Sequence, residues 1–292
     1  MTVEEWYKGG EKLMTAGVNV FYRHEGRGEA LICIHGFPTS SWDFAPLWEQ
    51  LTNRFEVLAA DLVGLGRSDK PNQNVSIAMQ ADVIEALAID QGIHTAHILA
   101  HDLGDTVAQE LLARQIENKA HVKWLSCVFL NGGIFPEVHR PRFIQKLLIS
   151  PLGSLVAKLS TERTFRRNMR NIFSKQYPPE EEFIRDSWRL LMENGGVQML
   201  PRLIRYMNER WEHRDRWVLP LENAKVPIRL INGVLDPVSG LHAANYYKEV
   251  VPNADVVLLD DAGHYPHVEV PEKVWSAFLD FHGRLPSHRV YN

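Results

Sequence analysis

Two aspartates and a histidine, Asp102, Asp236 and His264, each follow a short apolar segment of this chain. An aspartate is charged at neutral pH, so it can attack an sp3 carbon directly and form an alkyl ester, whereas a serine must first lose its proton to a base. A histidine held by a second carboxylate can then activate water to hydrolyse that ester. These residue types in this order predict hydrolysis through a covalent intermediate on Asp102, with Asp236 orienting His264.

Asp102 lies between a predicted strand and a predicted helix. The apolar residues 97–100 are typical of a buried parallel strand, and residues 106–112 carry apolar side chains one helical turn apart. Ala100 and Gly104 are small enough to let the strand and the helix approach each other closely. The pattern predicts a nucleophile elbow with aspartate at its apex. The alternative is an aspartate that only caps the helix that follows it.

The predicted partners of the nucleophile follow two later strands. Asp236 comes after the apolar residues 228–231, and His264 comes after residues 256–259. The order nucleophile, acid, histidine, each beyond the carboxyl end of a strand, is the chain order of α/β-hydrolases, and open parallel sheets place their sites at this edge. His267 competes with His264 for the role of the base.

Two further assignments come from position in the chain. The acid of the triad has a variant location after the apolar residues 125–130, but Asn131 stands there, which favours Asp236. Ester hydrolysis passes through an oxyanion, which needs preorganised donors. The backbone N–H groups of Phe37 and Leu103 are predicted to supply them, because Leu103 follows the nucleophile and Phe37 lies in the loop after another apolar strand.

The order of predicted elements indicates one α/β domain with an insertion. Apolar strands and amphipathic helices alternate up to residue 134 and again from residue 226, which predicts a mostly parallel central sheet flanked by helices. Between them the strand pattern disappears, and several helices are predicted instead. We therefore expect a core of residues 1–134 and 223–292, and a helical cap of residues 135–222.

The composition limits which partners and which cellular location are expected for this protein. The formal net charge of −4 over 292 residues gives no reason to expect nucleic acid or an anionic membrane as a partner. No apolar run approaches the roughly 20 residues that span a bilayer, and no signal peptide is visible, so the cytoplasm is the predicted location. Cys33 and Cys127 lie in apolar runs and are expected to be buried thiols. No cofactor or metal is expected, and the oligomeric state is not indicated.

Taken together, these motifs resemble the α/β-hydrolase superfamily over nearly the whole chain. The similarity is to the branch with aspartate nucleophiles, which holds epoxide hydrolases and haloalkane dehalogenases, and within it to the mesoderm-specific transcript group. It is carried by residues 35–41, 101–111, 131–136 and 235–237. The resemblance implies an α/β-hydrolase fold with an inserted helical cap, and an epoxide hydrolase acting on a small hydrophobic organic substrate and water.

The same resemblance implies the source of a proton for the opened ring. Epoxide hydrolases resemble one another in supplying this proton from cap tyrosines. Residues 201–210 are similar to the family's second tyrosine region, which implies Tyr206 as the acid. The first tyrosine of the family has no match in the early cap, and Tyr177, which lies later, is a candidate second donor.

Other functions remain open from the sequence. Haloalkane dehalogenases resemble this chain in their nucleophile, but they carry tryptophan directly after it, where Leu103 stands here. The alternative function is therefore a dehalogenase or another hydrolase with the same nucleophile. A further alternative is a binding protein that keeps the fold without turnover, because a fold does not determine a function.

Overall fold

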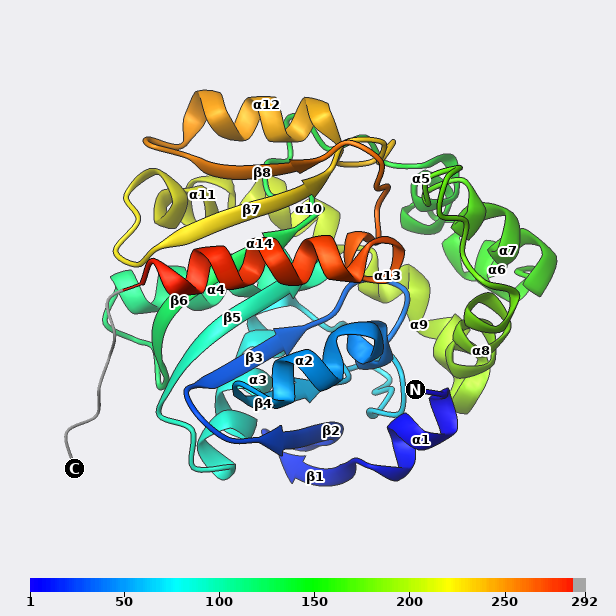
Figure 1. The fold of residues 1–292 in the computed structure, drawn as a ribbon. Coiled ribbons are helices and arrows are strands. Elements are labelled where there is room, and N and C mark those ends of the chain that lie inside the picture. The colour runs from blue at the N-terminus through cyan, green and yellow to red at the C-terminus, as the bar shows by residue number, and fades with distance from the viewer. Residues whose placement is uncertain (286–292) are drawn as a thin grey trace.

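A computed structural model describes residues 1–285 and shows an eight-stranded sheet with helices on both faces (Figure 1). The strand order is β1-β2-β4-β3-β5-β6-β7-β8. The pairs β1–β2 and β2–β4 are antiparallel, and every other neighbouring pair is parallel. The predicted α/β class is therefore confirmed. The strands are β1 (Glu11–Thr15), β2 (Val18–Gly26), β3 (Ala30–Ile34), β4 (Glu56–Ala60), β5 (Thr95–His101), β6 (Lys123–Leu130), β7 (Ile228–Gly233) and β8 (Asp255–Leu259).

The central strands are apolar along their whole length because both faces of the sheet are covered. All five residues of β3 are buried. Successive side chains of a strand point to opposite faces. Leu31 and Cys33 accordingly belong to one apolar cluster, and Ile32 and Ile34 belong to the other. The continuous apolar runs seen in the sequence are the signature of this two-sided burial.

Two layers of helices bury these clusters. Figure 1 shows α2 and α14 in front of the sheet and α4 behind it. Trp6, Trp48 and Phe278 fill the front cluster, while Ile84 and Val107 belong to the rear one. The helices of the core are α1 (Val3–Lys8), the 3-10 helix η1 (Ser41–Leu47), α2 (Trp48–Thr52), α3 (Ile77–Asp90), α4 (Leu103–Ile116), α12 (Leu241–Val250), α13 (Pro266–Glu269) and α14 (Pro271–Gly283).

The segment between β6 and β7 is helical throughout its regular elements. Figure 1 shows α5 to α9 gathered beside one end of the sheet, while α10 and α11 lie closer to the strands. The helices are α5 (Phe143–Ile149), α6 (Gly153–Lys158), α7 (Glu162–Arg170), α8 (Glu181–Met192), the 3-10 helix η2 (Glu193–Gly195), α9 (Gly196–Leu203), α10 (Tyr206–Glu212) and α11 (Arg214–Glu222). We call this segment the helical insertion.

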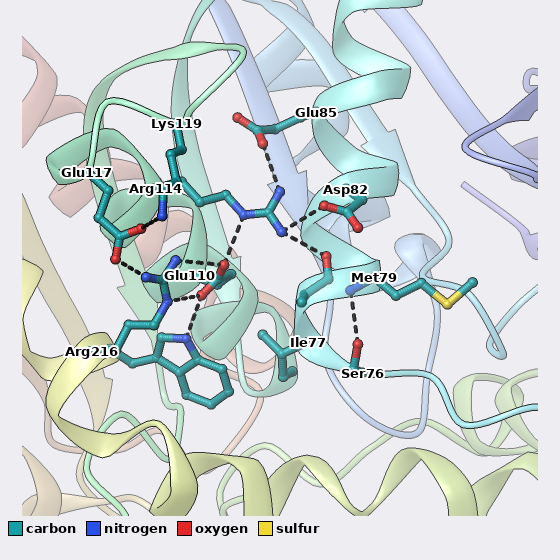
Figure 2. A network of polar contacts seen from close by, with 12 residues as sticks. Ser76, Ile77, Met79, Asp82, Glu85, Glu110, Arg114, Glu117, Lys119 and Arg216 are labelled. Carbon is teal, nitrogen blue, oxygen red and sulfur yellow. Dashed lines mark hydrogen bonds and ion pairs between the residues drawn. The ribbon is translucent and has the colours of Figure 1, made fainter.

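A network of charged side chains fastens α11 to the core (Figure 2). Glu110 of α4 accepts hydrogen bonds from Arg114 Nε at 2.9 Å, from Arg216 Nε at 2.9 Å and from Trp217 Nε1 at 2.7 Å. Arg114 also pairs with Glu85 of α3 at 3.0 Å. Hydrogen bonds to charged groups contribute about 1.5–3 kcal/mol each. The network therefore fixes α11, and with it the adjoining α10, against α3 and α4.

Two side chains satisfy backbone N–H groups at the start of α3. The Ser76 hydroxyl accepts a hydrogen bond from Met79 N at 3.1 Å, as an N-cap does. The carboxylate of Glu209, on α10, accepts a second bond from Ile77 N at 3.0 Å, which ties α10 to the start of α3.

Among residues 1–285, no helix combines the length and apolar character needed to cross a bilayer. Cys33 and Cys127 are buried and unpaired, as predicted.

Candidate active site

Asp102 stands at the apex of a sharp turn between β5 and α4. Its φ of 51° and ψ of −106° lie in a region that costs a residue other than glycine about 1–3 kcal/mol. Its side chain forms no capping hydrogen bond with α4, contrary to the helix-cap alternative. A Cβ on Gly104 would lie 2.2 Å from the Ile34 carbonyl oxygen, and one on Gly36 would lie 2.7 Å from Asp102 Cβ. The turn therefore requires glycine at both positions.

His264 lies between the carboxylates of Asp102 and Asp236. Its Nδ1–H donates to Asp236 Oδ2 at 2.8 Å, and its Nε2 lies 3.8 Å from Asp102 Oδ2. All three side chains are buried. The structure thus brings together the three residues that the sequence places after β5, β7 and β8. An imidazole in this position has a fixed tautomer, with Nε2 facing the nucleophile.

Asp236 is held by donors that the sequence analysis did not identify. Its carboxylate accepts hydrogen bonds from Asn131 Nδ2 at 3.1 Å, Ser239 Oγ at 2.8 Å and Val238 N at 2.7 Å. Burial alone would raise its pKa, but the charge and hydrogen bond of His264, with the hydrogen bonds from Val238 N and Ser239 Oγ, outweigh it and hold the pKa below the usual value. Asp236 is therefore a carboxylate that stays charged and fixes the ring of His264.

The carboxylates of Asp102 and Asp236 raise the pKa of His264. Burial lowers its pKa, but the charges of Asp236 and Asp102 overcome this and raise the pKa to about 9. Burial also raises the pKa of Asp102, against the opposing charges of His264 and Arg210. At neutral pH the resting site therefore holds the His264 imidazolium between the carboxylates of Asp102 and Asp236.

His267, the competing base, lies elsewhere. It belongs to α13, and burial lowers its pKa to about 3. Neither of its ring nitrogens has a hydrogen-bond partner among residues 1–285. Its neighbour His101 instead supports His264, because His101 Nε2–H donates to the His264 carbonyl oxygen at 2.8 Å.

Two side-chain groups have the composition of a metal site within the described part of the chain. Asp43, His101 and His267 each bring one ligand-type atom within 4.8 Å of the others. Glu29, His97 and His282 form the second such group. Neither group includes a residue of the triad.

Tyr206 lies fully buried near the nucleophile. Burial and then the charge of Asp102 raise the pKa of its hydroxyl, which has no hydrogen-bond partner among the described residues. Its ring lies 6.2 Å from that of Phe37, measured between centroids. Tyr206 thus lies near the predicted nucleophile and Phe37, but it is not among the described residues that line the cavity ending at Asp102.

Arg210 is a buried residue of the site that the sequence analysis did not single out. Its guanidinium carbon lies 4.6 Å from the centre of the Tyr206 ring. Nε donates to Thr106 Oγ1 at 2.8 Å, and Nη2 donates to the backbone oxygen of Asp102 at 3.3 Å. The buried carboxyl of Asp105 is also nearby: burial raises its pKa well above the usual value, while Arg210 opposes the shift. In the sequence, Arg210 could have been found only from its distance of four residues from Tyr206, which places it one helical turn further along the same helix.

A cavity of about 110 Å³ ends at the nucleophile. Asp102, His264, Phe37 and Pro38 line its base, and apolar residues of the insertion cover it. These apolar residues include Ile144, Leu148, Phe165 and Trp188. A cavity of this size and lining suits a compact and largely apolar molecule.

Of the remaining predicted site residues, Phe37 and Leu103 lie at the cavity or next to Asp102, whereas Tyr177 does not. Phe37 lines it, and the Leu103 N–H lowers the pKa of the neighbouring Asp102 carboxylate. Tyr177 lies outside it: its hydroxyl donates to Asp261 Oδ2 at 3.3 Å, and its ring lines a separate surface depression beside Trp42 and Phe183. The structure therefore does not bring Tyr177 to the triad.

Residues 31–277 match a family model described as the alpha/beta hydrolase family. The chain belongs to this family of hydrolases, as its sheet order and the elbow at Asp102 also indicate.

Among curated proteins, it is similar to the mesoderm-specific transcript homolog protein of Homo sapiens. The two are 37% identical over 292 residues, covering 96% of this chain and 87% of that protein. LipZ of Mycobacterium tuberculosis, which is named as a hydrolase, is 36% identical over 281 residues, covering 95% of this chain and 97% of LipZ. The expected resemblances to the α/β-hydrolase family and to the mesoderm-specific transcript group are confirmed.

Solved structures show the same fold. The epoxide hydrolase CorEH superposes with a TM-score of 0.76 at 20% identity, covering 95% of this chain and 99% of that chain. The haloalkane dehalogenase DatA from Agrobacterium tumefaciens C58 superposes with a TM-score of 0.80 at 16% identity, covering 95% of this chain and 97% of that chain. Identities this low establish a shared fold and no shared substrate.

Proposed function

We propose that this hydrolase opens epoxides to vicinal diols through a covalent ester on Asp102. The observation that carries the proposal is the position of His264, 2.8 Å from Asp236 and 3.8 Å from Asp102, at the base of a cavity with a largely apolar lining. A carboxylate at the elbow can attack carbon without prior deprotonation. The imidazole beside it can activate water against the resulting ester.

In the first step, a carboxylate oxygen of Asp102 bonds to one epoxide carbon and the ring C–O bond breaks. The Tyr206 hydroxyl gives its proton to the departing oxygen, which leaves a hydroxyalkyl ester and a tyrosinate. The closeness of Tyr206 to Asp102 supports this role, because the charge of Asp102 and a polar contact with it are among the causes that raise the pKa of the Tyr206 hydroxyl. The guanidinium of Arg210 on the ring stabilises the negative charge that develops there.

In the second step, the loss of negative charge on Asp102 turns His264 into a base. The carboxylate of Asp102 is one of the charges that hold the pKa of His264 near 9. Its conversion to an ester lowers that pKa, and the imidazolium proton passes to the tyrosinate of Tyr206. Neutral His264 then takes a proton from water as the water oxygen attacks the ester carbonyl. The N–H groups of Phe37 and Leu103 stabilise the oxyanion.

Collapse of this intermediate restores the resting site. His264 returns its proton to the departing alkoxide, which leaves as the diol. Asp102 is left as a carboxylic acid and passes its proton back to His264. The net change is one epoxide and one water consumed for one diol.

We infer that the helical insertion, residues 135–222, is a cap over a core of residues 1–134 and 223–292, of which residues 286–292 lie outside the part of the chain that the structure describes. Its apolar side chains cover the cavity above Asp102, which supports a small hydrophobic organic substrate. The two buried thiols suit a reducing compartment such as the cytoplasm.

The decisive experiment is intact-protein mass spectrometry of His264→Gln with small epoxides and with alkyl halides. Without the base, the ester accumulates. The expected result is a mass gain equal to the whole epoxide, localised to Asp102. His267→Gln, which changes the buried histidine three residues away, serves as the matched control and accumulates no ester.

Each other outcome changes the assignment. A gain equal to the alkyl group without its halogen identifies a dehalogenase. A folded His264→Gln that gains no mass with either panel overturns the covalent mechanism. Tyr206→Phe should slow ester formation far more than ester hydrolysis, and an unchanged rate of ester formation assigns the proton donor elsewhere.

A further inference from the structure

The active-site cavity contains a cation that no acidic side chain neutralises. Arg142 lines the cavity, and its guanidinium forms no ion pair within residues 1–285. Two arginines of α7 on the same insertion, Arg166 and Arg170, are paired, since both contact Glu181. Asp102 is the sole carboxylate among the described residues that line the cavity. The lining therefore places the Asp102 carboxylate and the His264 imidazolium together at the base of the cavity, and a separate positive charge without an acidic partner on the insertion.

Two neutral donors accompany this cation. Gln145 lines the cavity, and its Oε1 accepts the backbone N–H of Arg142 at 2.7 Å, which leaves its NH2 group free to donate. The side-chain amide of Asn168 also lines the cavity and has no hydrogen-bond partner among residues 1–285. The hydroxyls of Ser160 and Thr164 differ, because their protons bond to backbone carbonyls at 3.0 and 2.7 Å. Gln145 and Asn168 therefore each offer a free NH2 donor, as an anion requires.

We propose that Arg142, with Gln145 and Asn168, binds a carboxylate of the substrate, so that the preferred substrates are small epoxides carrying a carboxylate away from the ring. The inference rests on the proposed function and names its substrate class. A guanidinium fork matches a carboxylate, and a single arginine balances its single charge. Asp102 repels an anion, so the carboxylate binds toward Arg142 and the epoxide is directed to the nucleophile.

The apolar lining strengthens this contact. Arg142 lines the cavity together with apolar residues such as Ile144 and Leu148, and in such a setting electrostatic attraction is less screened than in bulk solvent. A charge-assisted hydrogen bond of this kind is expected to change the apparent affinity by about ten- to a hundredfold. The effect should fall mainly on KM, because the contact is equally present in the ground state and the transition state.

The test compares 5,6-epoxyhexanoate with 5,6-epoxyhexanamide, which have the same epoxide and differ in charge. The wild-type enzyme is expected to show a kcat/KM at least tenfold higher for the acid. Arg142→Gln should bring the acid-to-amide ratio close to one, and Arg142→Lys should restore part of it. Arg140→Gln changes an exposed arginine two residues away that does not line the cavity, and it should keep the wild-type ratio.

A second measurement separates this inference from the proposed chemistry. Calorimetric titration with the unreactive hexanoate and hexanamide reports the anion site even where no epoxide is turned over. Tighter binding of hexanoate to the wild type, lost in Arg142→Gln, supports the inference. Equal turnover of the acid and amide epoxides, or equal binding of hexanoate by the wild type and Arg142→Gln, overturns it. Failure of both epoxides to form an ester with His264→Gln refutes the proposed function instead.

Discussion

Arg210→Met tests whether the cation against Tyr206 speeds ring opening. The substitution keeps much of the aliphatic volume of Arg210 and removes a charge 4.6 Å from the ring centre. At an effective dielectric constant of about 20, two unit charges at that separation interact by roughly 4 kcal/mol. The phenolate oxygen is farther from the guanidinium than the ring centre is. The interaction of Arg210 with a full negative charge on that oxygen is therefore about 3 kcal/mol.

Only part of this energy appears in the rate. Proton transfer is incomplete in the transition state, so about half of the stabilisation, roughly 1.5 kcal/mol, is lost. This corresponds to about tenfold slower ester formation. The substitution also removes the bonds to Thr106 Oγ1 and to the Asp102 backbone oxygen, so a lower melting temperature is expected.

The assay is single-turnover ester formation, followed by mass spectrometry in the His264→Gln background. Arg210→Lys keeps the charge and loses the fork, so it should recover most of the rate while remaining less stable than the wild type. If folded Arg210→Met forms the ester as fast as the parent, the cation has no part in ring opening. Equal slowing by lysine and methionine would assign Arg210 a packing role alone.

Three further predictions concern the supports of the triad. The pKa of His264 is raised to about 9 in the folded protein from about 6.5 unfolded, so its contribution to stability is complete below pH 6.5 and is lost as pH rises through 9. Denaturant unfolding at pH 6 and pH 9.5 should therefore differ by an amount on the order of 2–3 kcal/mol that is absent in His264→Gln. Asn131→Ala removes a 3.1 Å donor from Asp236, and single-turnover ester hydrolysis should slow by about tenfold, with ester formation nearly unchanged. Glu110→Gln weakens the contacts to Arg216 and Trp217, so calorimetry should detect a loss of about 2 kcal/mol of stability, whereas an unchanged melting temperature would show that the network in Figure 2 adds nothing.

The positions of Asp102, Asp236 and His264 were predictable because one rule governs them. Each follows an apolar strand, and the carboxyl ends of parallel strands meet at one edge of the sheet. The apolar strand that precedes each residue was therefore enough to predict that the three side chains lie close together. The helix after Asp102 illustrates the limit of such patterns: it begins at Leu103 in the structure, whereas the apolar spacing indicated residue 106.

Arg210 and Asn131 could not be found in this way. The partner of Arg210 on α4 is Thr106, more than a hundred residues earlier, and the bond exists because α10 packs over the elbow. Asn131 reaches Asp236 because β6 and β7 are neighbours, which the sequence alone does not establish. Both side chains act through tertiary contacts that leave no periodic signal in the chain.

The contacts of the helical insertion divide it into two parts with different consequences for function. Helix α10, which carries Tyr206 and Arg210, is tied to the core through Glu209 and through the adjoining α11. Helices α5 to α9 pack largely on one another, and α5, α7 and α8 supply half of the residues that line the cavity. The groups proposed for chemistry therefore lie on the core or on the part of the insertion that is fastened to it, whereas many of the residues that contact the body of the substrate lie on α5, α7 and α8. Substitution of a lining residue such as Trp188 should then change KM by more than it changes the rate of ester formation.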